Sequence, residues 1–307
     1  MQNQKLLIIA NPYSGKGKIK TDLLTIVQIF SDANFDVTVY PTKHQGDAIA
    51  KAQSLSQNDY DRIVVCGGDG TLNEVITGIM RKGIKCTLGY IPYGTLNEWS
   101  SSLNISRNPK KAATDILSGC ELDLDIGKFD DRYFSYTASF GAFTEASYSA
   151  PQEVKNVLGQ AAYFFEGVKS LSNIKPLHLK FICDDREIED DFLFGAISNS
   201  MSVGGIVKFK DSIVNLNDGK FEVLLIKNPN SIVQFQSIVD GILSKELDCD
   251  GIEFFQASKI KVIGGENVPW TLDGEFSPGK EVVTLKNMPS SLHLVVPCNK
   301  KKILNKN

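Results

Sequence analysis

The sequence lacks any apolar run close to the roughly 18 residues that a helix needs to cross a bilayer. Its first apolar segment, Leu6–Ala10, is too short for the core of a signal peptide. Six cysteines are widely spaced without a CxxC motif, so neither a zinc site nor a disulfide framework is predicted. These absences predict a cytoplasmic protein that touches a membrane only transiently and peripherally.

The chain also has no excess of positive charge. The chain has 33 Lys and Arg against 36 Asp and Glu, which gives a net charge of −3 and a pI near 5.7. A general nucleic-acid binder is therefore not expected. With 307 residues, a hydrophobic fraction of 42% and a charged fraction of 22%, the chain suits two globular domains.

One stretch, residues 63–80, organises the rest. Ile63–Cys66 has the apolar pattern of a buried strand. The glycines that follow allow a backbone path that a Cβ would block; they are Gly67, Gly68 and Gly70. An apolar helical stripe comes next, formed by Leu72, Val75, Ile76, Ile79 and Met80. Thr71 and Glu74 have capping-box spacing, which predicts a helix that begins at Thr71.

A strand, a glycine turn and a helix N-terminus together form a site that favours phosphate, because backbone N–H groups and the helix dipole point at the ligand. A plain tight turn would have the same spacing. Asp69 lies inside this turn, and its carboxylate would repel bare phosphate unless Mg²⁺ lies between them.

Residues Gly67–Thr71 resemble the GGDGT signature of the diacylglycerol kinase catalytic-domain superfamily. That superfamily also includes the sphingosine, ceramide and NAD kinases and is related to the phosphofructokinases. Asn11–Lys18, which is not a Walker A loop, is similar to the NPxSG block that borders the nucleotide in lipid kinases. In the segment Pro41–Ala48, the resemblance implies that Thr42 contacts the nucleotide.

Strands and helices alternate over residues 1–126, which predicts a doubly wound, mostly parallel α/β domain similar to those of NAD kinases and phosphofructokinases. Ligands of such sheets bind at the carboxyl ends of the strands. The resemblance implies a set of ATP-binding residues in these loops: Asn11, Pro12, Ser14, Gly15, Thr42, Gly67, Gly68, Asp69, Gly70, Thr71, Leu72, Asn73, Gly94, Thr95 and Asn97.

The block Pro92–Trp99 departs from the family pattern P-x-GTGNDFAR. Leu96 replaces a glycine, Glu98 replaces the aspartate, Trp99 replaces the phenylalanine, and serines follow where Ala-Arg is usual. Leu96 adds a side chain where backbone should approach a ligand, and Glu98 lengthens the reach of its carboxylate. These changes keep open a nucleotide-binding regulatory protein with weak or no catalysis.

Residues 127–298 predict a second, mostly antiparallel β domain, with hairpin turns at Asp130-Asp131 and Asp184-Asp185. A helix is expected over 152–171, where Leu158–Tyr163 looks like the LGxxAY segment of bacterial lipid kinases. Residues 299–307 form a basic tail. The resemblance implies an active site in the cleft between the two domains.

Asn215–Glu222 resembles a turn of bacterial lipid kinases that holds a structural Mg²⁺. Carried over, the metal ligands are the Asp218 carboxylate and the carbonyls of Asn215 and Lys220. A plain Asn-Asp-Gly hairpin turn would have the same letters.

Residues 273–275 resemble the DGE element of the family, although the same letters would also make an ordinary turn. The resemblance implies that Glu275 accepts the proton, that Asp273 supports the metal or the base, and that Asp69 organises Mg²⁺ on the phosphates.

The resemblance therefore implies an ATP-dependent lipid kinase that converts diacylglycerol to phosphatidic acid at a membrane surface. Exposed strand edges in the second domain would allow a homodimer. An NAD kinase-like enzyme with a soluble substrate is the other catalytic alternative.

Overall fold

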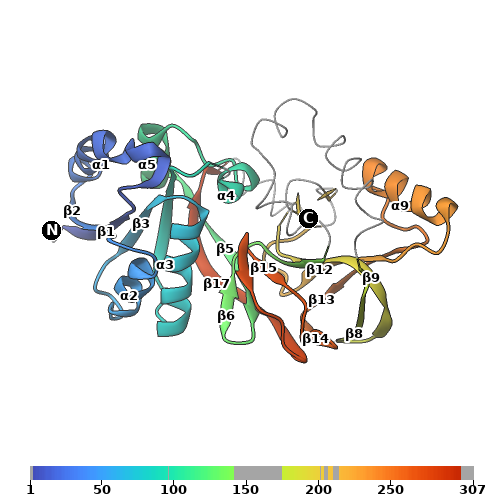
Figure 1. The fold of residues 1–307 in the computed structure, drawn as a ribbon. Helices are drawn as coiled ribbons and strands as arrows, with labels where there is room; N and C mark the ends of the chain where they lie inside the picture. The colour runs from blue at the N-terminus through green and yellow to red at the C-terminus, as the bar shows by residue number, and fades with distance from the viewer. Residues whose placement is uncertain are drawn as a thin grey trace. The chain divides into compact units, whose positions relative to one another are not determined.

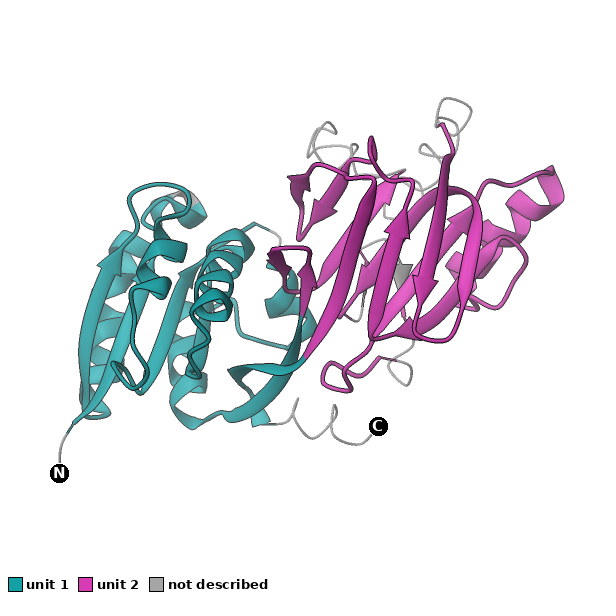
Figure 2. Ribbon diagram, turned by 90° about the horizontal axis from the view of Figure 1, so that it is seen from below, with its two compact units in different colours: residues 1–126, 289–307 teal, residues 127–288 magenta. Residues whose placement is uncertain are grey.

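The computed structural model describes residues 3–95, 97–141, 175–200, 202–203, 207–209 and 214–298. It divides into two compact units (Figure 2): residues 1–126 with 289–307, and residues 127–288. The chain passes from one unit to the other inside two strands, β5 (Cys120–Phe129) and β17 (Val282–Val296). Each unit has its own hydrophobic core.

The first unit has the predicted parallel sheet. Its strands are β1 (Gln4–Ala10), β2 (Phe35–Pro41), β3 (Arg62–Gly67) and β4 (Thr87–Pro92), in the order β2-β1-β3-β4. All of these pairs are parallel, so every strand ends at the same edge of the sheet.

Helices cover both faces of this sheet (Figure 1). Helix α1 (Ile19–Asp32) and helix α5 (Pro109–Ser118) pack on one face. Helix α2 (Asp47–Gln53) and helix α3 (Asp69–Lys82) lie on the other. The stripe of α3 is buried as predicted, apart from Met80, which is half-buried. The doubly wound fold is therefore confirmed.

The carboxyl end of β17 also belongs to the first unit, although residues 289–298 were expected in the second domain. His293 and Leu294 of β17 pair in parallel with Thr87 and Leu88 of β4. A disulfide between Cys120 and Cys298 joins residues 178 positions apart. The prediction without disulfides was wrong on this pair, because cysteine spacing does not reveal which distant strand ends meet in the fold.

The second unit is mostly antiparallel, as predicted. Its strands are β6 (Arg132–Phe134), β7 (Thr137–Gly141), β8 (Leu177–Cys183), β9 (Glu187–Ser198), β10 (Ser202–Val203), β11 (Val207–Lys208), β12 (Phe221–Lys227), β13 (Ile252–Ala257), β14 (Lys259–Ile263), β15 (Trp270–Leu272) and β16 (Glu275–Ser277). The main sheet has the order β16-β15-β7-β9-β8-β14-β17, and β12 lies between β9 and β13. The predicted hairpins at Asp130-Asp131 and Asp184-Asp185 join β5 to β6 and β8 to β9.

Aromatic side chains form the centre of this second core. Trp270 is fully buried, and its ring lies edge-on to Phe140 at 4.9 Å and to Phe129 at 5.1 Å between centroids. Contacts of this kind are favourable beyond the area that they bury. They fix β15, and therefore the turn that follows it at Asp273.

Helix α9 (Ile232–Ser244) is capped by Ser231, whose Oγ accepts from Gln234 N at 3.1 Å. Among the described residues, no helix is long and apolar enough to cross a membrane. The helix expected over 152–171, the substitution at Leu96 and the tail at 299–307 lie outside the described residues.

Candidate active site

The loops that leave the four parallel strands are joined by backbone hydrogen bonds. Asn11 N donates to Cys66 O at 2.9 Å, and Thr42 N donates to Ala10 O at 2.8 Å. At the other side of β3, Tyr93 N donates to Gly67 O at 2.7 Å. The structure thus brings together, at one edge of the sheet, loops whose residues lie as far apart in the sequence as Asn11 and Tyr93.

Two glycine turns touch backbone to backbone at this edge. A Cβ on Gly94 would lie 2.8 Å from the Cα of Gly68, which is closer than real Cβ contacts allow. Gly15 has a φ of +61°, and a Cβ there would lie 2.8 Å from the carbonyl oxygen of Tyr93. Any side chain at these positions would push the loops apart, so glycine is needed for the close approach.

Helix α3 begins at Asp69, with Gly68 as its N-cap, and not at Thr71. Leu72 N donates to Gly68 O at 3.1 Å. The predicted capping box is wrong because both of its side chains have distant partners. Thr71 Oγ1 accepts from Asn11 Nδ2 at 3.1 Å. The Glu74 carboxylate accepts from the N–H groups of Gly46 and Ala48, at 2.8 and 3.3 Å, and so caps helix α2.

Asp69 is the only acidic residue in the first turn of α3. Its Oδ2 accepts from the Glu98 N–H at 3.1 Å, at the start of helix α4 (Glu98–Ser102). Its Oδ1 is buried, with no hydrogen-bond partner among the described residues. Burial raises the pKa of Asp69, while its backbone hydrogen bonds and the charge of Arg107 act in the opposite direction. A buried carboxylate oxygen in this state fits a cation, which would supply the missing interaction.

Asn97 shapes the neighbouring turn. It is 3% exposed and left-handed, with a φ of +52°. Its Nδ2 donates to Gly94 O at 2.6 Å, and its Oδ1 accepts from the Tyr90 hydroxyl at 3.2 Å. The amide therefore holds the glycine turn in place, while the adjacent Thr95 is exposed.

The other predicted nucleotide residues differ in what they offer. Thr42 is buried, and the side chain of Leu72 lies in the core. Asn73 Oδ1 accepts from Thr77 within the same helix. Gly70 is exposed. Pro12 is half-buried, and so is Ser14, the first residue of the 3₁₀ turn η1 (Ser14–Gly17).

In the second unit, residues 273–274 form a two-residue hairpin turn between β15 and β16. Leu272 pairs with Glu275, and φ is positive at both turn residues, +49° at Asp273 and +86° at Gly274. Asp-Gly is the sequence that favours a type I′ turn of this kind. Residues 273–274 therefore form the ordinary tight turn that their residue types alone predict.

Asp273 is saturated by backbone donors. Its Oδ2 accepts from Ser135 N at 2.5 Å, and its Oδ1 accepts from Tyr136 N and Thr137 N at 2.9 and 3.0 Å. The Tyr136 hydroxyl donates to the Asp273 carbonyl oxygen at 2.9 Å. This carboxylate ties the turn to the start of β7. Glu275, two residues on, is exposed.

The Asp218 turn needs no metal to explain it. Lys220 N donates to Asp218 Oδ1 at 3.0 Å, and Asn217 N donates to Asn215 Oδ1 at 3.3 Å. Asp218 is exposed. In the part of the chain that the structure describes, no group of three or more His, Cys, Asp or Glu side chains could hold a metal. A metal at this turn stays a prediction.

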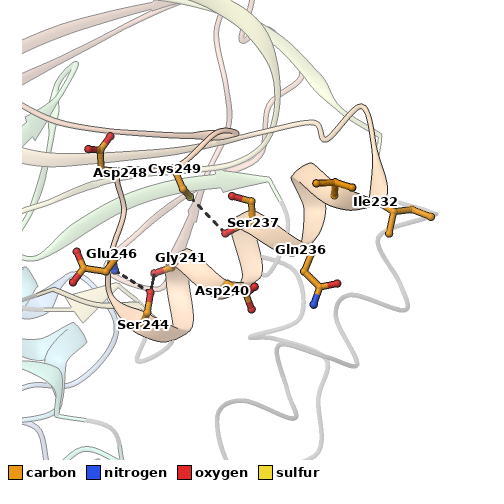
Figure 3. A pocket seen from close by; sticks show the side chains of 10 residues that line it. Ile232, Gln236, Ser237, Asp240, Gly241, Ser244, Glu246, Asp248 and Cys249 are labelled. Atoms are coloured by element: carbon orange, nitrogen blue, oxygen red, sulfur yellow. Dashed lines mark hydrogen bonds between the residues drawn. The ribbon is translucent and has the colours of Figure 1, made fainter.

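A hollow of about 620 Å³ lies along helix α9 (Figure 3). Its charged lining residues are all acidic: Asp240, Glu246 and Asp248. It includes none of the predicted site residues. These carboxylates would repel a triphosphate that carries no bound cation, so the lining does not favour a nucleotide.

Two residues have positions that their sequence patterns did not reveal. Asp125 of β5 is fully buried, and its Oδ1 accepts from Ser290 N at 2.8 Å. Arg107 follows helix α4, and its charge acts on Asp69. No motif marks Arg107 in the sequence.

Comparison with known proteins agrees with this geometry. Residues 5–129 match the model of the diacylglycerol kinase catalytic domain. Residues 138–296 match the YegS C-terminal NAD kinase beta sandwich-like domain. The catalytic-domain match favours a lipid kinase over an NAD kinase-like enzyme.

Curated relatives match over nearly the whole chain. A diacylglycerol kinase of Bacillus subtilis is 31% identical over 95% of this chain and 96% of its own. One from Staphylococcus saprophyticus is 29% identical over 94% of each chain. The chain also matches the crystal structure titled as a putative diacylglycerol kinase from Bacillus anthracis str. Sterne, with a TM-score of 0.79 at 27% identity. This match covers 96% of each chain. The chain is therefore a kinase that belongs to the diacylglycerol kinase family, as its fold, the loops at the carboxyl edge of its parallel sheet and these relatives show together.

Proposed function

We propose that the chain transfers the γ-phosphate of ATP to the hydroxyl of diacylglycerol, giving phosphatidic acid, ADP and a proton. The observation that carries this proposal is the set of loops around Asp69, where glycine backbones meet at the carboxyl edge of the parallel sheet. Phosphoryl transfer depends mostly on positioning and charge neutralisation. The names of the relatives support the choice of lipid.

In the first unit, the turn from Gly67 to Thr71 would hold the phosphates through backbone N–H groups at the start of α3. Asp69 would bind Mg²⁺ through Oδ1, which has no hydrogen-bond partner among the described residues. Bound Mg²⁺ would neutralise charge on the β- and γ-phosphates. Thr42 and Thr95 would line the nucleotide.

In the second unit, Glu275 would accept the proton of the lipid hydroxyl. Its exposed carboxylate can be approached by a substrate. Asp273 would act through its hydrogen bonds to residues 135–137, which fix the hairpin that presents Glu275.

The lipid acceptor implies that the enzyme works at a membrane surface through peripheral contact. The described residues provide no spanning helix. A homodimer, which exposed strand edges would allow, stays a prediction.

The test is transfer of labelled γ-phosphate from ATP and Mg²⁺ into a mixed lipid extract, followed by identification of the labelled product. We expect labelled phosphatidic acid. A different labelled lipid would keep the kinase and replace the acceptor. Labelled NADP⁺ in a parallel reaction with NAD⁺, without labelled lipid, would show the NAD kinase-like alternative. ATP binding without any transfer would show a regulatory protein.

A further inference from the structure

Strands β7 and β15 of the second unit carry hydroxyl side chains on the face of the sheet that points away from the aromatic core. Along β7, Thr137 and Ser139 alternate with Ala138 and Phe140, which belong to that core. Thr271 of β15 lies directly opposite Ser139. Alternate residues of a strand share one face, and so do residues directly opposite in an antiparallel pair. Thr137, Ser139 and Thr271, which we call the hydroxyl cluster, therefore lie on one face, with successive members about 5 to 7 Å apart.

The hydroxyl cluster is buried but lacks protein partners. The exposed fractions of Thr137, Ser139 and Thr271 are 6%, 8% and 8%. Within the described residues, Thr137 Oγ1 has no hydrogen-bond partner, and the side chains of Ser139 and Thr271 make no hydrogen bond either. Ser198, opposite Thr137 on β9, differs because its Oγ donates to Tyr136 O at 3.1 Å. A buried hydroxyl without a hydrogen bond is costly, so acceptors from outside the protein are expected at the cluster.

The same face of the sheet becomes apolar beyond the cluster. Ser139 lies opposite Ala196 of β9, and Ala196 lies opposite Leu224 of β12. One further step along these strands places Phe194 opposite Ile226. All four of these apolar residues are buried. A ligand that fits this face therefore has acceptor oxygens at one end and hydrocarbon next to them.

The cluster also lies beside the turn that carries Glu275. Thr137 N donates to Asp273 Oδ1 at 3.0 Å, and Asp273 N donates to Thr137 O at 2.9 Å. In diacylglycerol the free hydroxyl and the nearest ester are on adjacent carbons of the glycerol backbone. A site for the ester must therefore lie next to the group that accepts the proton of the hydroxyl.

We infer that the hydroxyl cluster donates hydrogen bonds to the ester carbonyl oxygens of the lipid and so selects an acceptor that is an ester. This inference rests on the proposed function and names the part of the lipid that the second unit recognises. An ester carbonyl accepts hydrogen bonds and donates none, so it complements hydroxyl groups that have no acceptor in the protein. The apolar side chains beyond the cluster suit the start of an acyl chain.

The alternative is that the cluster binds only ordered water. The two roles differ in their response to an ether analogue, a dialkylglycerol that keeps the free hydroxyl and the chains of diacylglycerol but has no carbonyl oxygen. Loss of an ester contact weakens the reaction of the ester alone. Loss of a water site or of local structure affects both lipids equally.

The experiment measures kcat/KM for diacylglycerol and for its ether analogue of equal chain length, in mixed micelles with ATP and Mg²⁺. The variants are Thr137→Val, Ser139→Ala and Thr271→Val, which remove one hydroxyl each. The matched control is Ser277→Ala, because Ser277 is 2% exposed and lies opposite Trp270 on the other face of the same hairpin. Melting temperatures at or above that of the wild type are expected, since the hydroxyls removed from the cluster have no protein partner.

We expect the wild type to prefer the ester about 10-fold. Each cluster variant should lower kcat/KM for the ester about 2- to 10-fold, the range for one neutral hydrogen bond, and leave the ether unchanged. Ser277→Ala should keep the preference of the wild type. Equal losses with both lipids, or an unchanged preference in all three variants, would overturn the inference. If the wild type phosphorylates both lipids equally, the proposed function stands and the inference fails; if it phosphorylates neither, both fail.

Discussion

Each unit has an aspartate next to a glycine in its predicted site, Asp69 in the first and Asp273 in the second. The two carboxylates differ in how many hydrogen bonds the protein donates to them. Asp69, in the first unit, leaves one buried oxygen without a partner among the described residues. Asp273, in the second unit, accepts three backbone N–H groups with its two oxygens. Both residues are aspartates followed by a glycine, but Asp69 begins helix α3 whereas Asp273 lies in a hairpin turn. The difference between them lies in the donors that the fold supplies around each carboxylate.

Under the proposed function, this comparison separates a carboxylate that is available to a ligand from one that is used for structure. Burial without full hydrogen bonding is costly and persists where a ligand can repay it. A saturated carboxylate already has its favourable interactions and gains less from a ligand. We therefore propose that in the second unit Glu275 is the residue that takes part in the chemistry and that Asp273 positions it.

The largest expected effect comes from Glu275→Gln. If Glu275 is the proton acceptor, lipid phosphorylation should fall by about 10²- to 10⁴-fold, the usual range for a general base. Steady-state kinetics with lipid in mixed micelles measures this. Glu266→Gln, at another exposed turn of the second unit, is the control and should keep full activity. If Glu275→Gln kept activity close to that of the wild type, Glu275 would not be the proton acceptor.

Asp69→Asn should lower activity by at least about 10²-fold, because it removes a key charged group from the site. The same change should raise stability, since it relieves a buried charge. Thermal unfolding and phosphate transfer, measured on one preparation, test both effects. Asp36→Asn, which changes an exposed aspartate of the same unit, should alter neither.

The stability that Asp69→Asn gains over the wild type should depend on pH in a defined direction. Burial raises the pKa of Asp69 above its ordinary value of 3.8, so the folded state holds this proton to higher pH than the unfolded state. Wild-type stability should therefore fall relative to Asp69→Asn as pH rises from about 3.8 through the folded-state pKa, and the gap should then level off. A gap that closes with rising pH would contradict the burial of an unpaired charge.

Asp273→Ala should act mainly on stability, because it leaves three backbone N–H groups without their acceptor. We expect a loss of about 2–4 kcal/mol in the free energy of unfolding, measured with urea. Asp131→Ala, at the exposed turn between β5 and β6, is the control and should change it by less than about 0.5 kcal/mol. A stable Asp273→Ala variant that has lost activity would show that Asp273 contributes more directly to the chemistry.

Glu74→Ala gives the smallest effect, about 1 kcal/mol, through the lost cap on helix α2. Glu74→Gln keeps an acceptor oxygen and should recover much of it. Hydrogen exchange at Gly46 and Ala48 would locate the change. If the Glu74→Ala variant instead lost protection from hydrogen exchange at the start of α3, Glu74 would cap its own helix, as the predicted capping box requires.

The sequence predicted the fold class because its periodicities are local. Alternating strands and helices over 1–126, and hairpin turns at Asp130 and Asp184, follow from nearby residues alone. The resemblance through GGDGT, NPxSG and DGE indicated the family, which the comparisons confirmed. The roles of the individual site residues stay predictions.

Tertiary structure decided which partners each polar group has. Glu74 caps a helix 26 residues earlier, Asp273 accepts from residues near 136, and Cys120 pairs with Cys298. Spacing along the chain describes only neighbours on one helix or strand. Hydrogen bonds and disulfides form between whatever groups the folded backbone brings within reach, and that depends on the packing of the whole unit.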